Sequence, residues 1–236
     1  MTFRNHTLWE VLQSAFSVPI WEKVVPAIWE TLYMVVLSTI FTFIIGLLLG
    51  LVLVLTSKEG LHPVVWFNRL LGAIVNCLRS LPSMIMIIIM LPLARLILGK
   101  GYGANACIIA LIASCVPMYG RLVENSLLEI QKGKIEAAKA MGLGSARILF
   151  TIMVPETLPS LIRSSTVAVV AVISMTALAG SFGAGGLGDI AVRFGFNRFQ
   201  WDILIATVFV LVIMVQFVQL IGDLIAKLIL KKRHLL

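Results

Sequence analysis

Three long runs without a charged residue constrain this chain more than any other feature of its sequence. They cover residues 31–55, 164–187 and 203–222. Each run has enough residues to cross about 30 Å of hydrocarbon as a helix, which takes about 20 residues. The whole chain is 60% hydrophobic and only 13% charged, a more apolar composition than that of ordinary soluble domains. The sequence therefore predicts an all-α integral membrane protein.

Two further apolar segments complete a predicted set of five spans. They cover residues 81–98 and 104–120. The first of them contains Pro82 and Pro92, which membrane helices accept as bends, and Arg95, which can reach outward beside the following glycines. A chain of 236 residues with five spans has no room for an additional soluble catalytic domain.

The two ends of the chain differ from the transmembrane domain that we predict at 25–230. Residues 1–24 mix charges with tryptophans, which is typical of a segment on the membrane surface. Residues 231–236 form a basic tail. Most basic residues fall in the loop after the first span, in the interval 125–155 and at the C-terminus, so we expect these parts in the cytoplasm and the N-terminus outside.

Several other classes of function are disfavoured by the composition. The net charge is +8, but the basic residues stand at the ends of apolar runs, so they indicate topology and not nucleic-acid binding. Cys77, Cys107 and Cys115 lie in or beside apolar segments and are interpreted as packing residues, with no metal site or disulfide. The sequence contains no Walker A motif and no nucleophile-base arrangement, so we predict that this chain is not an enzyme.

One glycine-rich stretch satisfies the dinucleotide-binding pattern G-x-G-x-x-G at residues 183–188. That pattern is meaningful only after a strand in a βαβ unit, whereas here it ends an apolar run. We interpret its glycines as a sharp turn at the external mouth of a cavity, where irregular backbone is tolerated. The residues of this predicted mouth are Gly183, Gly185, Gly186 and Gly188.

The charged interval 125–155 is organised around a glycine. Good helix formers run from Asn125 to Met141, and Gly142 follows, a residue that readily adopts the left-handed conformation that ends helices. A second, short helix is expected from Ser145 to Met153, and Pro155 should block its continuation. The interval therefore predicts two helices joined by a glycine elbow.

Ala137 and Ala138 have almost no side chain, so another protein could approach the backbone closely there. The residues alone leave open an alternative, an amphipathic segment that lies on the lipid surface.

The spacing of this interval resembles the signature of the permease subunits of ABC importers. That signature reads Glu-Ala-Ala, three residues, Gly, nine residues, then Ile-x-Leu-Pro, and this chain departs from it only at Val154, where Leu is usual. The resemblance implies the ABC importer type I permease fold, in which this segment is a cytoplasmic coupling helix that docks into a separate ATPase subunit. The matching positions are Glu136, Ala137, Ala138, Gly142, Ile152 and Pro155.

Two other regions are similar to methionine-import ABC permeases. They are residues 184–196, with the glycines of the mouth, and residues 121–130, and the similarity extends from about Trp29 to the C-terminus. The resemblance implies a homodimer in the bacterial inner membrane, an external substrate-binding lipoprotein, and two ATPase subunits that hold ATP and Mg, with no cofactor in this chain. The implied cargo is methionine, including D-methionine or derivatives.

The fourth span should line the translocation path because it joins the coupling segment to the mouth. Ser174, Met175 and Leu178 are the predicted path or gate residues, and packing or lipid-facing roles are the alternative. Two other functions stay open from sequence. One is import of another amino acid, a short peptide or another small solute, and the other is a membrane scaffold or channel without an ATPase.

Overall fold

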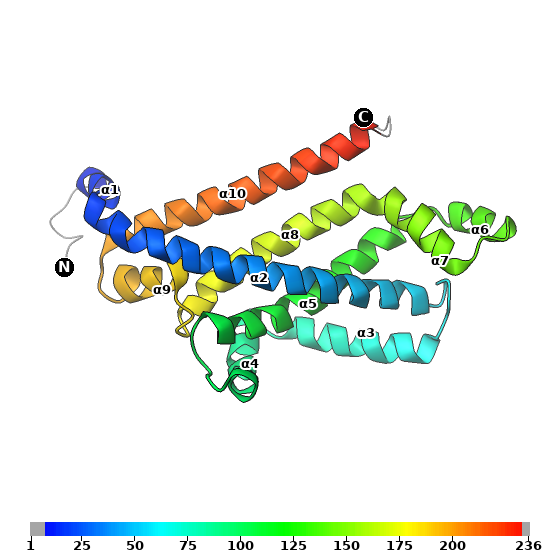
Figure 1. The fold of residues 1–236 in the computed structure, drawn as a ribbon, viewed down its shortest axis with the longest axis horizontal. Coiled ribbons are helices and arrows are strands. Elements are labelled where there is room, and N and C mark those ends of the chain that lie inside the picture. The colour runs from blue at the N-terminus through cyan, green and yellow to red at the C-terminus, as the bar shows by residue number, and fades with distance from the viewer. Residues whose placement is uncertain (1–7, 233–236) are drawn as a thin grey trace. The chain divides into compact units, whose positions relative to one another are not determined.

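The structure, a computed structural model, describes residues 8–232. Within that range every regular element is a helix, which confirms the predicted all-α fold (Figure 1). Two of the elements are π-helices, η1 and η2. In chain order the elements are α1 (Leu8–Ala15), α2 (Val18–Thr56), α3 (Val65–Ser80), α4 (Ser83–Leu98), α5 (Ala104–Leu128), α6 (Lys132–Ala140), α7 (Ser145–Ile148), η1 (Leu149–Met153), α8 (Val154–Gly180), α9 (Gly186–Ile190), η2 (Ala191–Phe196) and α10 (Trp201–Lys232).

Four helical stretches are long and apolar enough to cross a membrane. They are α2, α5, the continuous helix Ser145–Gly180, and α10. α4 has 16 residues, fewer than the about 20 that a crossing takes, so residues 81–98 do not form the separate span that the sequence predicts. Counted together with α3, α4 gives a fifth candidate span, in agreement with the predicted number.

The helices do not follow the segment boundaries that the sequence suggested at the two ends. α2 begins at Val18 and runs without a break past residue 24. At the other end, α10 includes the first two basic residues of the tail. Residues 1–7 and 233–236, which belong to the predicted end segments, lie outside the described residues.

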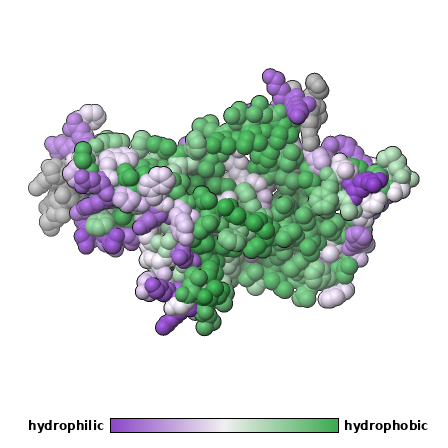
Figure 2. All heavy atoms as spheres, viewed as in Figure 1, coloured by the Kyte–Doolittle hydropathy of each residue, from purple (hydrophilic) through white to green (hydrophobic). Residues whose placement is uncertain are grey.

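The chain forms two compact units, and α2, α5, α8 and α10 each contribute to both. The first unit contains residues up to 40, 82–114 and 169–218, and the second contains 41–81, 115–168 and 219 onward. Over the second unit, Figure 2 shows hydrophobic side chains along the long helices and hydrophilic ones gathered around α6. This distribution is expected of helices that meet lipid and of a connecting segment that meets water.

The first unit is built around two apolar clusters. One brings α1 and the start of α2 against α9 and α10, with Val24 and Leu187 completely buried. The other packs α2 against α4, α5 and the end of α8, with Met34, Ile87 and Leu111 buried. These clusters fix the glycine-rich turn that follows α8.

The second unit joins α5 to α8 by both apolar and hydroxyl contacts. Val123, Leu127 and Ile148 are buried in its core. Beside them runs a series of paired hydroxyls, which we call the serine seam: Tyr119 with Ser165 at 2.8 Å, Ser126 with Ser164 at 2.8 Å, and Ser160 donating to Ser126 at 3.2 Å. Such pairs satisfy polar groups that have no water to bond in a membrane interior.

Candidate functional site

The predicted coupling segment contains one more break than the sequence suggests. The expected single helix from 125 to 141 is wrong, because α5 ends at Leu128 and α6 begins only at Lys132. Ile130 lies in the connecting turn and is 8% exposed, packed into the core of the second unit. Burial of this side chain therefore outweighs the helix propensity of the charged residues around it.

Gly142 ends α6 as the sequence predicts. Its φ is +76°, in the left-handed region, and it is flanked by the two hydrogen bonds of a Schellman motif. The Gly142 N–H donates to the Lys139 carbonyl at 2.9 Å, and the Leu143 N–H donates to the Ala138 carbonyl at 3.2 Å. A Cβ at Gly142 would meet no atom within 4 Å. This glycine is therefore required for backbone conformation and not for packing.

The second helix of the elbow does not stop at Pro155. α7, η1 and α8 form one continuous helical stretch from Ser145 to Gly180, so the predicted block at the proline is wrong. Pro155 lies inside this continuous helix, just after the π-helical turn η1, and membrane helices accept proline where such local adjustments accommodate the lost N–H. The π-turn just before it adds one residue to the helical repeat and places both Leu149 and Met153 in the core.

The two alanines of the signature have different environments. Ala138 is completely buried in the core of the second unit, whereas Ala137 and Glu136 are exposed. Close approach by a partner is therefore possible at Ala137 and not at Ala138. Ile152 packs against the same core, so the segment presents an outer face on α6 and an inner face that attaches it to the unit.

Two ion pairs connect α6 to other parts of the second unit, and neither could be predicted from the sequence. Lys132 Nζ lies 2.5 Å from Glu59 Oε2 in the α2–α3 loop, and Lys134 pairs with Glu156 at the start of α8. The hydrogen bond and charge of Lys132 lower the pKa of Glu59, and Glu59 in turn raises the pKa of Lys132. The two ion pairs thus connect α6 to the α2–α3 loop and to the first turn of α8.

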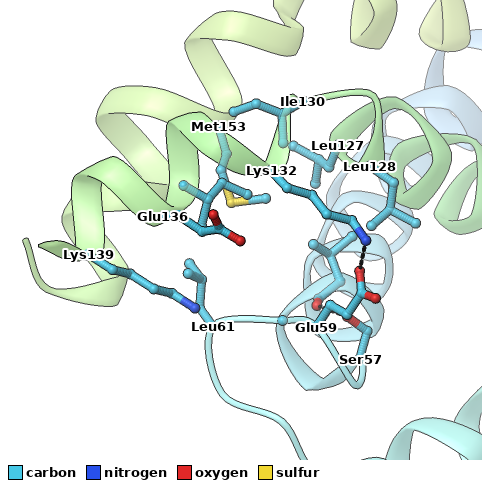
Figure 3. A pocket seen from close by; sticks show the side chains of 13 residues that line it. Ser57, Glu59, Leu61, Leu127, Leu128, Ile130, Lys132, Glu136, Lys139 and Met153 are labelled. Atoms are coloured by element: carbon cyan, nitrogen blue, oxygen red, sulfur yellow. Dashed lines mark hydrogen bonds and ion pairs between the residues drawn. The ribbon is translucent and has the colours of Figure 1, made fainter.

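A cavity of about 350 Å³ lies between α6 and the α2–α3 loop (Figure 3). Its apolar lining comes from α2, α5, α6, η1, the α2–α3 loop and the α5–α6 turn, and its charged lining comes from α6 and the α2–α3 loop. The Glu136 carboxylate points into the cavity, and the Lys139 ammonium lies beside Leu61 at its edge. The main lining residues are Val54, Leu61, Leu127, Leu128, Ile130 and Met153, with Glu59, Lys132, Glu136 and Lys139 as the charged ones.

The predicted path residues lie in the part of α8 that belongs to the first unit. Ser174 and Leu178 are exposed on one face, one helical turn apart, and the Ser174 hydroxyl donates to the Val170 carbonyl of its own helix. Met175 is half-buried and packs against the core that contains Met34. The structure therefore brings two of the three residues to one open face, and their role in a path stays a prediction.

The glycine-rich turn is held by the first long helix. Glu30 Oε2 accepts the Gly186 N–H at 2.6 Å, and Thr31 Oγ1 accepts the Leu187 N–H at 2.8 Å. Gly183, Gly185 and Gly186 have φ between +77° and +81°, as a sharp turn requires. No strand precedes the turn anywhere in residues 8–232, so the setting of a dinucleotide site is absent there. The carboxylate and hydroxyl satisfy amides at the start of α9.

Metal-ligating side chains do not converge in the part of the chain that the structure describes. No group of three or more His, Cys, Asp or Glu residues within it is placed to hold an ion. The three cysteines are free thiols, two of them buried. The two features of the described residues that could serve a function are therefore the exposed helix α6 and the glycine-rich turn before α9.

The comparisons with known proteins define the class. The family described as "Binding-protein-dependent transport system inner membrane component" matches residues 46–234. The chain therefore belongs to this family of inner-membrane transport components, whose members span the membrane several times.

Individual relatives show which members of the family the chain resembles. The chain is 39% identical over 223 residues to "Probable D-methionine transport system permease protein MetI" of Vibrio cholerae, covering 94% of this chain and 96% of the relative. It is 44% identical over 207 residues to "Methionine import system permease protein MetP" of Bacillus subtilis, covering 87% and 93%.

A solved structure titled as inward-facing conformations of the MetNI methionine ABC transporter matches the fold with a TM-score of 0.86. The identity is 35%, and the match covers 91% of this chain and 99% of that chain. A second structure, of an amino acid ABC transporter with histidines, has a TM-score of 0.74 at 13% identity, with 89% and 95% covered, and supports the fold alone. The predicted type I permease fold is confirmed.

Proposed function

We propose that this chain is the membrane-spanning permease subunit of an ATP-driven importer and that its cargo is methionine. The observation that carries the proposal is the coupling segment: a short exposed helix, ended by a left-handed glycine and fixed to a membrane-embedded core. A helix held in this way can transmit the motion of a partner to the spans behind it. The names of the relatives support methionine as the cargo.

The proposal includes the assembly around the chain. Two copies form the membrane part, two ATPase subunits that hold ATP and Mg contact α6, and an external lipoprotein delivers the cargo. No cofactor is assigned to this chain. The coupling segment and the C-terminus lie in the cytoplasm and the N-terminus lies outside, in keeping with the distribution of basic residues.

The roles of individual residues form part of the proposal. Ala137 faces the ATPase and Glu136 lies at the edge of that contact, with its carboxylate toward the cavity. Gly142 sets the angle of the elbow, and Ala138, Ile152 and Pro155 fix the segment to its unit. Ser174, Met175 and Leu178 border the path. The external mouth is formed by Gly183, Gly185, Gly186 and Gly188.

Uptake of labelled substrate tests the cargo. The chain and its neighbouring transport genes are expressed in a bacterium that lacks other methionine importers, and initial uptake of L-methionine is measured against unlabelled competitors. We expect competition by L- and D-methionine and little by charged amino acids. Stronger competition by another amino acid or a short peptide would replace methionine as the cargo, and uptake without a co-purifying ATPase would contradict the importer class.

Reversal of the charge at Glu136 tests the coupling role. Glu136→Lys should abolish uptake while the protein still inserts in the membrane, because it reverses the charge of α6 next to Ala137, at the edge of the expected ATPase contact. Glu129→Lys, at another exposed glutamate just before α6, is the matched control and should retain most uptake. Normal uptake by Glu136→Lys would contradict the assignment of α6 as the coupling helix.

A further inference from the structure

We propose that the cavity between α6 and the α2–α3 loop is a binding site for a zwitterion with a short apolar side chain, the chemistry of an apolar α-amino acid. This inference rests on the proposed function, because it places the imported amino acid, after its release in the cytoplasm, against the coupling helix. The cavity volume of about 350 Å³ lies in the range of about 300–1,000 Å³ that is usual for small-molecule sites.

The cavity has an apolar floor. Leu127 and Met153 are buried side chains of the core of the second unit, and they line the cavity together with Val54 and Ile130. A thioether or branched aliphatic side chain would find there the dispersion contacts that water cannot provide. The sulfur of Met153 adds a polarisable surface that adapts to irregular shapes.

The rim carries two opposite charges, and the charge of Glu136 is also among the causes that raise the pKa of Lys132. Glu136 and Lys139 stand three residues apart on α6, and both heads lie at the opening of the cavity (Figure 3). Neither forms an ion pair with another of the residues 8–232, whereas the nearby Lys132 is already paired with Glu59. A ligand with an ammonium and a carboxylate on one carbon would give both Glu136 and Lys139 an ion-pair partner.

The charge balance argues against other small ligands. The four charged lining residues comprise two carboxylates and two ammoniums, so a nucleotide or another polyanion would meet Glu59 and Glu136 as well as the lysines. A fatty acid would pair with Lys139 but leave Glu136 beside its own carboxylate. Only a ligand that carries both charges satisfies Glu136 and Lys139 together.

Photolabelling of the assembled transporter tests the site. The complex, purified in lipid nanodiscs without the external lipoprotein, is irradiated with a diazirine analogue of methionine, and the adducts are mapped by mass spectrometry. We expect adducts in residues 54–61, 127–139 and around Met153. Excess L-methionine should suppress them at least tenfold. Its methyl ester and its α-hydroxy analogue, which each lack one charge, should suppress them far less.

A pocket-filling variant provides the control. Leu128, which is 56% exposed and lines the cavity, is changed to Trp, and Leu96, which is 83% exposed and belongs to the first unit, is changed to Trp as the match. Labelling of the segments should fall at least fivefold in Leu128→Trp and stay unchanged in Leu96→Trp, with both complexes eluting as the native assembly.

Three results would overturn the inference: no adducts in these segments, equal suppression by the singly charged analogues, or equal suppression by a short fatty acid. Uptake by the same preparation, reconstituted with the lipoprotein, is measured in parallel. Methionine uptake with no labelling here would refute the site alone. Absence of methionine uptake would refute the proposed cargo. The labelling pattern would still decide whether the cavity binds a zwitterion.

Discussion

Two glycine turns of this chain use the same backbone conformation for opposite reasons. Gly142 ends α6 in open space, with no atom within 4 Å of where a Cβ would stand, whereas a Cβ at Gly186 would lie 2.6 Å from Thr31 Oγ1. Both have φ near +76°. The first turn needs glycine for conformation alone and leaves its surroundings clear for a partner, and the second is enclosed by its own unit. A glycine in a turn therefore says little about function until its neighbours are known.

The largest expected effect comes from crowding Gly188 in α9, the helix at the end of the enclosed turn. In Gly188→Ala the new Cβ would lie 2.3 Å from the Ala177 carbonyl oxygen. Backbone atoms cannot move aside as a flexible side chain can, so we expect a loss of about 3 kcal/mol of folding free energy, the upper end of the usual cost of overpacking. The yield of monodisperse protein after extraction measures it.

Gly133→Ala is the control for this experiment, because nothing lies within 4 Å of its Cβ position and alanine favours helix. It should extract normally. Equal yields of the two variants would mean that α9 tolerates an added Cβ at Gly188 and that the surroundings of the enclosed turn are less crowded than the structure indicates.

The open turn should lose activity without losing the fold. Gly142→Val places a β-branched residue at a positive φ, which costs about 1–2 kcal/mol, and the elbow relieves that cost by changing its angle. We expect uptake to fall at least tenfold at normal membrane levels of the protein.

Two substitutions bracket this result. Gly144→Val should keep uptake, because Gly144 has an ordinary φ of −70° and an equally open Cβ position. Gly142→Asn should keep more uptake than Gly142→Val, since asparagine tolerates the left-handed region. Full uptake by Gly142→Val would show that the elbow angle does not matter.

A smaller effect is expected from the ion pair between α6 and the α2–α3 loop. The Lys132 and Glu59 side chains are 73% and 68% exposed, so solvent screens the pair and its contribution to stability is small. Reversing either charge should lower uptake by less than the tenfold expected for Gly142→Val, with little change in thermal stability. Exchanging both residues should restore it. Failure of the double variant to recover would assign the loss to something other than the pair.

The smallest expected effect is that of pH on this pair. Glu59 has a pKa lowered from 4.5, so its contribution is present above 4.5 and is lost as the pH falls through the lowered value. Lys132 has a pKa raised from 10.5, so its contribution is present below 10.5 and is lost only above the raised value. Between about pH 6 and about pH 8 both groups stay charged, and the ratio of uptake by the native protein to that by Glu59→Gln should be constant. A ratio that changes within this interval would contradict the pKa directions.

The sequence predicted the elements whose cause is local and missed those whose cause is distant. The apolar runs marked the membrane helices, and Gly142 marked the end of α6. The break at Ile130 and the continuation through Pro155 were missed because both depend on which side chains the core of the second unit buries. Separation along the chain hid the ion pair, since Glu59 and Lys132 are brought together only by the fold. The alanine pair shows the same limit, because spacing cannot say that Ala138 faces inward.

The serine seam has a consequence for motion in an oily environment. Ser126 bonds to both Ser164 and Ser160, which stand one helical turn apart on α8. Because Ser126 sits between the two serines, a small shift of α5 along α8 in either direction brings its hydroxyl nearer to one partner as it leaves the other. The seam can therefore follow a small movement of the two helices while this hydroxyl keeps a hydrogen bond, which matters where no water is present to replace it.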